Sequence, residues 1–246
     1  MILLSAYWTN LLVLNFEADK KIFAQYLPAG TELNDWNGKY IISLVGFQFS
    51  KTKFLGIPSS FYRSFPEINL RFYVKRKTKD GWRKGVVFIK EIAPAKLIGC
   101  MAGWLYHENF IALPMKHSLF LKGNEKEIEY KWKINNEWNY MKAIVKSESL
   151  SYPNESLENF VSSHYWGYTK LSEQKTKEFE VIHRPWHVYP VRSSEIKLDV
   201  ETIYGKKAAA YLAASPCSVF LMDGSETKVT APVLIKLNQN KATDYL

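Results

Sequence analysis

The stretch Glu67-Ile68-Asn69-Leu70-Arg71-Phe72-Tyr73-Val74-Lys75 decides the fold class, because its apolar residues fall on every second position. A β-strand sends successive side chains to opposite faces, so this spacing predicts a strand with one apolar face. The side chains of the other face carry charged, amide or hydroxyl groups: Glu67, Asn69, Arg71 and Tyr73. We therefore predict a β-strand with an unusual number of functional groups on a single face.

Further strand-like runs, bounded by turn residues, lie on both sides of this stretch. They are 10–16, 40–49, 85–90, 127–134, 138–146, 167–171, 177–183, 195–199, 217–222 and 228–237. We predict a hairpin at Asn135-Asn136, between 127–134 and 138–146, and another at Asp223-Gly224, between the last two runs. Helical spacing is confined to short segments, at 18–27, 95–106, 157–165 and 200–214. The pattern indicates a β-rich, mainly β fold with a few short helices and no long parallel βαβ units.

The composition suits one domain over residues 1–246 that ends in a polar tail at 237–246. Hydrophobic residues make up 47% of the chain and charged residues 23%, which provides core material and excludes a disordered chain. No apolar stretch approaches the roughly 20 residues that span a bilayer, and the N-terminus lacks the features of a signal peptide. We therefore expect a cytoplasmic protein. Cys100 and Cys217 are too few for a disulfide framework or a zinc site.

The charge excess is concentrated in one segment. The chain has 33 basic and 24 acidic residues, a net charge of +9, and segment 75–84 contributes +5 of it from six basic residues and Asp80. Asp80-Gly81 lies between two strand-like runs, so the segment is predicted to form the tip of a β-hairpin. Lysines commonly protect sheet edges, and this interpretation is preferred. Binding of nucleic acid is the lesser alternative, and we expect neither nucleic acid nor membrane as a partner.

A second dense cluster is His183-Arg184-Pro185-Trp186-His187. Two histidines four residues apart could share a metal ion on a helix, but Pro185 argues against a helix here. The preferred interpretation is a packed strand end in which the His183 ring satisfies a backbone group. The serines lie in no nucleophile elbow and the glycines form no phosphate loop, so we expect no metal and no cofactor.

Several motifs, in this order along the chain, carry a resemblance to a known family. They are Phe65-Pro66-Glu67-Ile68-Asn69-Leu70-Arg71-Phe72-Tyr73-Val74, Gly85-Val86-Val87-Phe88, Leu113-Pro114, His164-Tyr165-Trp166-Gly167-Tyr168 and His183-Arg184-Pro185-Trp186. Together they resemble the bacterial YqjF-like family of unknown function, which is similar to acetoacetate decarboxylases. The resemblance implies an antiparallel β-barrel or cone with short helices packed outside and a central cavity.

Acetoacetate decarboxylases use a lysine Schiff base. The motif that carries this lysine resembles a stretch of the chain that contains Lys116. Activation of such a lysine by a neighbouring cation lowers the pKa of its amine. In the matching stretch Ala112-Leu113-Pro114-Met115-Lys116, the resemblance places Met115 at the nucleophile position and Lys116 at that of the activating neighbour. We keep Lys116 as a candidate catalytic residue and Met115 as a candidate ligand contact. The alternative is that Lys116 is an ordinary surface lysine.

In a barrel, the polar face of 67–75 would line one side of the cavity. Arg71 would then hold a carboxylate, and Glu67 would serve as general acid or base once burial raises its pKa. Asn69 and Tyr73 are candidate ligand contacts beside them. The alternative is a solvent-exposed strand face with Glu67 and Arg71 as a modest pair.

Two functions remain open from the sequence. The first is a binding protein whose cavity holds a small organic acid or apolar metabolite. The second is a decarboxylase-like lyase or a hydrolase that acts on a small carboxylate in the same cavity. The methionine at position 115 favours the first. The sequence leaves the ligand, the enzymatic status and a homo-oligomer open.

Overall fold

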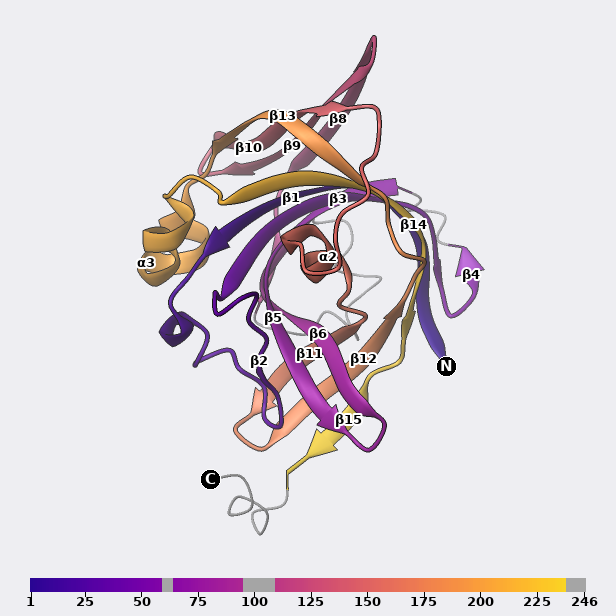
Figure 1. Cartoon of the computed structure of the whole chain (residues 1–246), viewed down its shortest axis with the longest axis vertical. Helices are drawn as coiled ribbons and strands as arrows, with labels where there is room; N and C mark the ends of the chain where they lie inside the picture. The colour runs from indigo at the N-terminus through magenta and orange to yellow at the C-terminus, as the bar shows by residue number, and fades with distance from the viewer. Residues whose placement is uncertain (59–63, 95–108, 238–246) are drawn as a thin grey trace.

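The computed structural model describes residues 1–58, 64–94 and 109–237, and most of them lie in β-strands (Figure 1). The elements are β1 (Ile2–Glu17), η1 (Lys20–Ile22), β2 (Glu32–Leu33), β3 (Ile41–Phe54), β4 (Ile57–Pro58), β5 (Ser64–Thr78), β6 (Gly81–Ala93), β7 (Phe110–Ala112), β8 (Met115–Lys122), β9 (Glu125–Ile134), β10 (Glu137–Lys146), α2 (Leu157–Ser162), β11 (Trp166–Ser172), β12 (Lys175–Ile182), β13 (Val188–Lys197), α3 (Val200–Leu212), β14 (Ser218–Thr230) and β15 (Val233–Lys236). The predicted mainly β fold is confirmed.

The strand pairings run around a ring. β1 pairs with β3, β3 with β5, β5 with β6, β6 with β11, β11 with β12, β12 with β14, and β14 again with β1. All of these pairings are antiparallel except β6 with β11. Two of them are short, since β6 meets β11 over three residue pairs and β12 meets β14 over two. The strands of this ring, called the central strands below, therefore curl into the cone that the resemblance implied.

A second group of strands, β8, β9, β10 and β13, packs against the convex side of the curled strands (Figure 1). Its fully buried side chains Tyr130 and Trp132 share a core with Leu12, Leu44 and Leu70 of the central strands. We call this the outer core. Gly46 permits the close approach, because a Cβ atom there would lie 2.9 Å from the Tyr130 ring. The central strands are thus buried on both faces.

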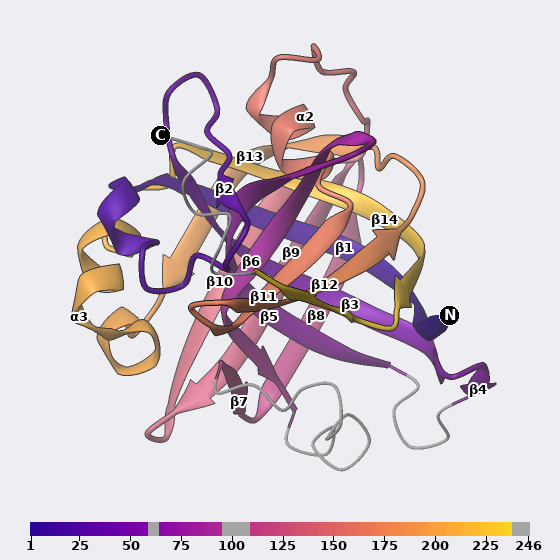
Figure 2. The same cartoon turned by 90° about the horizontal axis from the view of Figure 1, so that it is seen from below.

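The concave side has a core of its own, here called the inner core, and α2 lies in it (Figure 1). Leu157 and Val161 of α2 pack there with Val45 and Phe220. The Ser156 side chain caps the helix by accepting a hydrogen bond from the Asn159 N–H. Helix α3 lies away from α2, beside the outer core, in both views (Figures 1 and 2).

A bulge in β1 lets side chains on both sides of it point into the inner core. Leu4 and Ala6 face it before the bulge, whereas Leu11 and Val13 face it afterwards, so the alternation shifts by one residue. The shift occurs at Asn10, whose φ of 55° lies in the left-handed region. The register between β1 and β3 jumps at the same place. A bulge therefore preserves burial where strict alternation would expose an apolar face.

The hairpin predicted at Asp223-Gly224 is wrong, because β14 runs straight through it. Gly224 lies opposite Thr9, and a Cβ atom at Gly224 would sit 1.9 Å from the Trp8 carbonyl oxygen. Its φ is 84°, which favours glycine. The glycine that was interpreted as a turn signal thus permits close strand contact at an irregular point of a continuous strand.

Other local predictions have mixed outcomes. The hairpins at Asp80-Gly81 and Asn135-Asn136 are confirmed, as are the helices near 157–165 and 200–214. Segment 18–27 forms only the short turn η1 instead of a helix, and segment 95–106 lies outside the described residues. In the described part of the chain, no helix is long and apolar enough to cross a membrane.

Candidate functional site

The polar face of β5 points to the concave side of the cone and is buried there. The exposed fractions of its four side chains are 7% for Glu67, 2% for Asn69, 8% for Arg71 and 1% for Tyr73. The alternative of a solvent-exposed strand face is therefore wrong. The other face of the strand contributes to the outer core through Ile68, Leu70, Phe72 and Val74, so β5 is buried on both faces. We call these four side chains and Glu91 the β5 polar cluster.

Arg71 is a buried cation without a counter-ion among the described residues. Its Nε atom is buried and finds no hydrogen-bond partner there. The register places Ser43 of β3 and Phe88 of β6 on either side of it, and neither carries a negative charge. The nearest described aromatic contact is the Tyr73 ring, 5.9 Å from the guanidinium carbon. A buried charge is costly unless an anion compensates it, so this position suits an incoming anion.

Two amide side chains on the same concave face also have unused polar atoms. Asn69 donates a long hydrogen bond of 3.4 Å from Nδ2 to Glu67 Oε1, while its Oδ1 finds no partner among the described residues. Asn15 is fully buried, and its Nδ2 is likewise without a partner there. Each such atom costs about 1–3 kcal/mol in a folded protein. Both atoms thus lie on the concave face without a partner in the described part of the chain, as does Arg71 Nε, and a ligand or ordered water that reached them would complete their hydrogen bonding.

Glu67 and Glu91 form a pair of carboxyl groups on neighbouring strands. Glu91 of β6 lies opposite Asn69, which puts it diagonally across from Glu67 on the same face. Burial raises the pKa of Glu67 well above its ordinary value, and the neighbouring Glu91 carboxylate raises it further. Burial also raises the pKa of Glu91, to about 7. Burial and the repulsion between the two carboxylates therefore favour a proton on the pair near neutral pH, and a protonated carboxyl group can donate a hydrogen bond.

The other end of the β5 polar cluster is fixed by a hydrogen-bonded chain. The Tyr73 hydroxyl lies 2.7 Å from Ser43 Oγ, which in turn donates to Asn15 Oδ1 at 2.5 Å. The Tyr73 ring packs edge-on against Phe160 of α2, with centroids 5.1 Å apart. Helix α2 thereby holds the strand face in place rather than leaving it free to move.

His164, just beyond α2, joins this end of the cluster as a neutral side chain. Its Nε2 lies 2.9 Å from Asn34 Nδ2, and its Nδ1 lies 2.7 Å from the Phe160 carbonyl oxygen. Burial, together with the positive charges of Arg71 and Lys84, lowers the pKa of His164 to about 3. Sequence reasoning did not select His164, Glu91 or Ser43. Glu91 was detectable only through the strand register, because it lies 16 residues beyond the end of the 67–75 motif.

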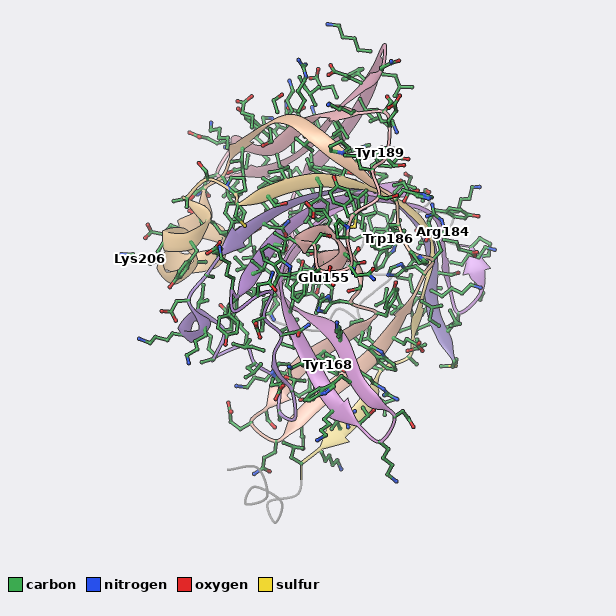
Figure 3. The ribbon with its side chains drawn as sticks, in the orientation of Figure 1. Glu155, Tyr168, Arg184, Trp186, Tyr189 and Lys206 are labelled. Carbon is green, nitrogen blue, oxygen red and sulfur yellow. The ribbon has the colours of Figure 1, made fainter. Side chains whose placement is uncertain are left out.

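The His183–His187 cluster forms a packed corner after β12, as expected. The His183 ring stacks on Trp186 with centroids 3.8 Å apart, and its Nδ1 lies 2.7 Å from the Arg184 carbonyl oxygen. Trp186 donates to Ser225 Oγ at 3.0 Å, and Arg184 pairs with Asp223 at 2.7 Å. Trp186 and Arg184 are labelled in Figure 3. Burial lowers the pKa of His183, and the charges of Arg71 and Arg184 act in the same direction. This corner thus packs beside the inner core with a neutral imidazole.

Met115 and Lys116 lie in β8, on the second group of strands and apart from the concave face. The Lys116 side chain is exposed, with its ammonium 5.0 Å from the centre of the Trp138 ring. Met115 packs against the outer core instead. The structure does not bring either residue to the β5 polar cluster, and the alternative of an ordinary surface lysine describes the position of Lys116. In residues 1–58, 64–94 and 109–237, no three His, Cys, Asp or Glu side chains gather to hold a metal ion.

Residues 5–226 match the family DUF2071, described as an uncharacterized conserved protein. The chain belongs to this family. Within 202 aligned residues this DUF2071 chain is 27% identical to the uncharacterized protein YqjF of Bacillus subtilis strain 168, covering 80% of the chain and 78% of YqjF. The resemblance to YqjF is confirmed.

The fold of the DUF2071 chain is similar to that of two solved structures. An acetoacetate decarboxylase-like enzyme from Sphingomonas wittichii RW1 superposes with a TM-score of 0.63 at 11% identity, covering 97% of this chain and 95% of that one. The enduracididine biosynthesis enzyme MppR complexed with pyruvate gives a TM-score of 0.60 at 12% identity, covering 95% and 91%. At such low identities the comparison establishes the fold, and function has to be argued from the site.

Proposed function

We propose that the DUF2071 chain binds a small organic carboxylate on the concave face of its cone. The observation that carries the proposal is Arg71, a buried guanidinium with no counter-ion among the described residues and with an unpartnered Nε. A guanidinium recognises a carboxylate through paired N–H donors. The bound anion would remove the cost of the buried positive charge and supply the missing acceptor.

The remaining groups of the β5 polar cluster would recognise a second functional group of the ligand. A protonated Glu67 or Glu91 donates a hydrogen bond, which suits a keto or hydroxyl oxygen near the carboxylate. The free Oδ1 of Asn69 accepts one, which suits a hydroxyl group. MppR, which shares the fold, has been solved with pyruvate, a small keto acid. We therefore infer that keto and hydroxy acids are the ligands to test first.

A second candidate function is acid–base catalysis on the same ligand, as in a lyase or hydrolase. It is favoured by Glu91, because a group with a pKa of about 7 exchanges protons readily at neutral pH. A Schiff-base reaction through Lys116 is not supported, since that amine lies on the exposed side of the second group of strands. Conversion of the bound acid, followed by NMR, would distinguish catalysis from binding.

The experiment compares the binding of pyruvate, acetoacetate and 3-hydroxybutyrate to three proteins by NMR titration. These are the natural chain, Arg71→Met and the control Arg192→Met, which removes an exposed arginine paired with Glu125. We expect the natural chain and the control to bind at least one acid, and Arg71→Met to bind it at least tenfold more weakly. Equal binding by Arg71→Met would exclude Arg71 as the carboxylate contact. An absence of binding by the natural chain to all three acids would contradict the proposed ligand class.

We also infer that the basic β5–β6 hairpin does not bind nucleic acid. Three of its six basic residues, Lys75, Arg76 and Arg83, are ion-paired within the chain, with Glu32 or Glu178. Binding to a phosphate backbone depends on free cations spread along a surface. Salt-sensitive submicromolar binding to generic DNA would contradict this inference.

A further inference from the structure

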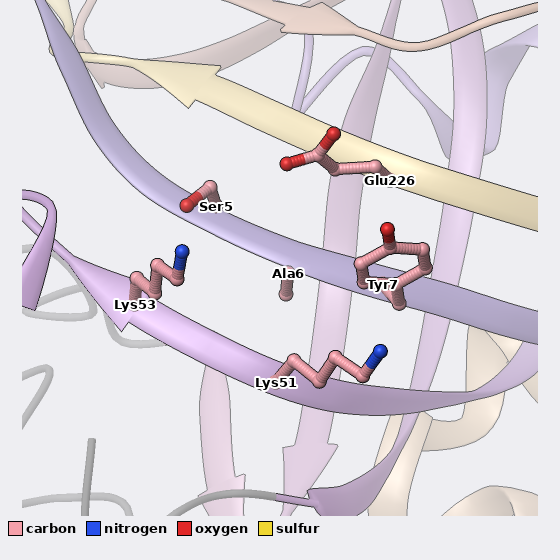
Figure 4. A pocket seen from close by; sticks show the side chains of 6 residues that line it. All are labelled: Ser5, Ala6, Tyr7, Lys51, Lys53 and Glu226. Carbon is pink, nitrogen blue, oxygen red and sulfur yellow. The ribbon is translucent and has the colours of Figure 1, made fainter. Parts of the chain in front are cut away.

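A shallow pocket on the outside of the cone lies where the second group of strands no longer covers the central sheet. It has a volume of about 220 Å³ and is lined by residues of β1, β3 and β14 (Figure 4). The lining residues are Ser5, Ala6, Tyr7, Lys51, Lys53 and Glu226. The pocket is separate from the β5 polar cluster, because Ser5 and Tyr7 point away from the inner core that Leu4 and Ala6 enter.

The strand register arranges the pocket side chains in two rows. In the first row, Ser5 lies between Lys53 of β3 and Lys228 of β14. In the second row, Tyr7 pairs with Glu226 of β14, and the Lys51 ammonium lies 4.9 Å from the centre of the Tyr7 ring. Figure 4 shows the Lys53 and Glu226 head groups directed toward the space around Ser5. The Ser5 hydroxyl therefore has a lysine opposite it on each neighbouring strand, and Glu226 is the acidic residue that lines the same pocket.

These charges are not used for internal ion pairs. Within the described residues, none of Lys51, Lys53, Glu226 and Lys228 lies within ion-pairing distance of an opposite charge. Lys51, Lys53 and Glu226 line the pocket and Lys228 lies beside it in the register, so these three cations and one anion have no ion-pair partner in the described part of the chain. An exposed pair normally forms on a sheet wherever opposite charges lie directly across from one another. Here each charged residue faces Ser5 or Tyr7 instead.

The shape of the pocket depends on a bulge in β3. Between β1 and β3 the register shifts from the pair Ser5–Lys53 to the pair Tyr7–Ser50, so β3 has an extra residue opposite Ala6. Lys51, within this bulge, has a φ of 51°. A lysine in the left-handed region is uncommon and costs roughly 1–2 kcal/mol. Bulges redirect side chains, and this one brings Lys51 to the same side as Lys53.

We propose that this pocket binds a small zwitterion, with its oxyanion at Ser5 between Lys53 and Lys228 and its ammonium at Glu226 beside the Tyr7 ring. The two cations of the first row attract an oxyanion, and the Ser5 hydroxyl donates a hydrogen bond to it. The Glu226 carboxylate attracts an ammonium and repels an anion that lacks one. Specificity for a zwitterion over a simple anion follows from that single acidic side chain.

The test uses three probes, phosphoethanolamine, inorganic phosphate and ethanolamine, in NMR titrations read at the backbone amides of Ser5, Tyr7, Lys53 and Glu226. The natural chain is expected to bind phosphoethanolamine more tightly than either of the other probes. Glu226→Gln should weaken phosphoethanolamine binding about two- to fivefold and strengthen phosphate binding by a similar factor, as for exposed charge pairs. Lys53→Gln should weaken both anionic probes.

The matched control is Lys146→Gln, which removes one exposed positive charge at the end of β10, away from the pocket. It should leave all three affinities unchanged, which separates a local contact from an effect of net charge. If Glu226→Gln strengthens both anionic probes, the pocket is a simple anion site and the proposal fails. The proposal also fails if no probe shifts these amides at millimolar concentration, or if Lys146→Gln acts like Lys53→Gln.

Discussion

Two charge clusters lie on opposite faces of strand β5, one around the buried Glu178 and one around the buried Arg71. Their charges are compensated to very different degrees. On the outer face, Arg76 and Arg83 bind the two oxygens of Glu178, at 3.0 and 2.6 Å, and Arg83 also stacks 4.1 Å from the centre of the Trp166 ring. On the concave face, Arg71 has no such partner in the described part of the chain. The outer cluster is thus compensated within the chain and joins β5, β6 and β12. The inner cluster keeps an uncompensated charge, which is why we propose it as the ligand contact.

The largest effect should come from removing the shared carboxylate of the outer cluster. Glu178→Leu leaves Arg76 and Arg83 facing each other, so we expect the free energy of unfolding to fall by about 3 kcal/mol, the lower end for a broken buried pair. Urea denaturation of the natural chain and the variant measures it. A loss below about 1 kcal/mol would mean that the outer cluster contributes no more to the free energy of unfolding than the inner one.

The next effect concerns the carboxyl pair and depends on pH. Because the pKa of Glu91 is raised to about 7, the folded state holds a proton that the unfolded state releases near pH 4.5. Stability from this proton is complete below pH 4.5 and is lost as pH rises through about 7. Glu91→Gln should therefore match the natural chain in free energy of unfolding at pH 4.5 and exceed it by up to about 3 kcal/mol at pH 8.

Urea unfolding at pH 4.5, 6, 7 and 8 checks this dependence. Glu148→Gln is the matched control, since Glu148 is exposed and has no ion pair in the described structure. It should follow the natural chain at every pH. A Glu91→Gln variant that is equally destabilised at all pH values would show that the carboxyl group is not protonated in the folded protein.

Replacing Arg71 should change the free energy of unfolding in the opposite direction from replacing an arginine of the outer cluster. Arg71→Met replaces an uncompensated buried charge with an apolar side chain of similar length, so the free energy of unfolding should stay unchanged or rise by about 1 kcal/mol. Arg83→Met should instead lower it, because Glu178 loses a partner. Thermal and urea unfolding of the two variants side by side measures the contrast. Equal destabilisation by both would remove the distinction between the clusters.

The smallest effect is expected at Lys116. Because this side chain is exposed and its ammonium lies over the face of Trp138, Lys116→Ala should change the free energy of unfolding by less than about 0.5 kcal/mol. Borohydride treatment with acetoacetate, read by intact mass, should give no adduct that depends on Lys116. An adduct that appears in the natural chain and disappears in the variant would make Lys116 the nucleophile.

The local sequence pattern predicted secondary structure correctly where a residue's neighbours in sequence decide its conformation. The alternation of 67–75 and the turn residues at Asn135-Asn136 predicted their elements, since pleating and turn geometry involve only a few adjacent residues. The same reasoning failed at Asp223-Gly224, where close contact with the Trp8 carbonyl on another strand requires the glycine. Segment 18–27 had helical spacing, yet only η1 formed there.

The sequence by itself determined that this DUF2071 chain is mainly β and that Glu67, Asn69, Arg71 and Tyr73 share one face, because side-chain direction in a strand alternates with a period of two residues. Only the tertiary structure decided that this face is buried, that Glu91 adjoins it and that Lys116 lies elsewhere. Those outcomes depend on strand register, on bulges and on which sheet covers which, and these are set by packing between residues far apart in the chain.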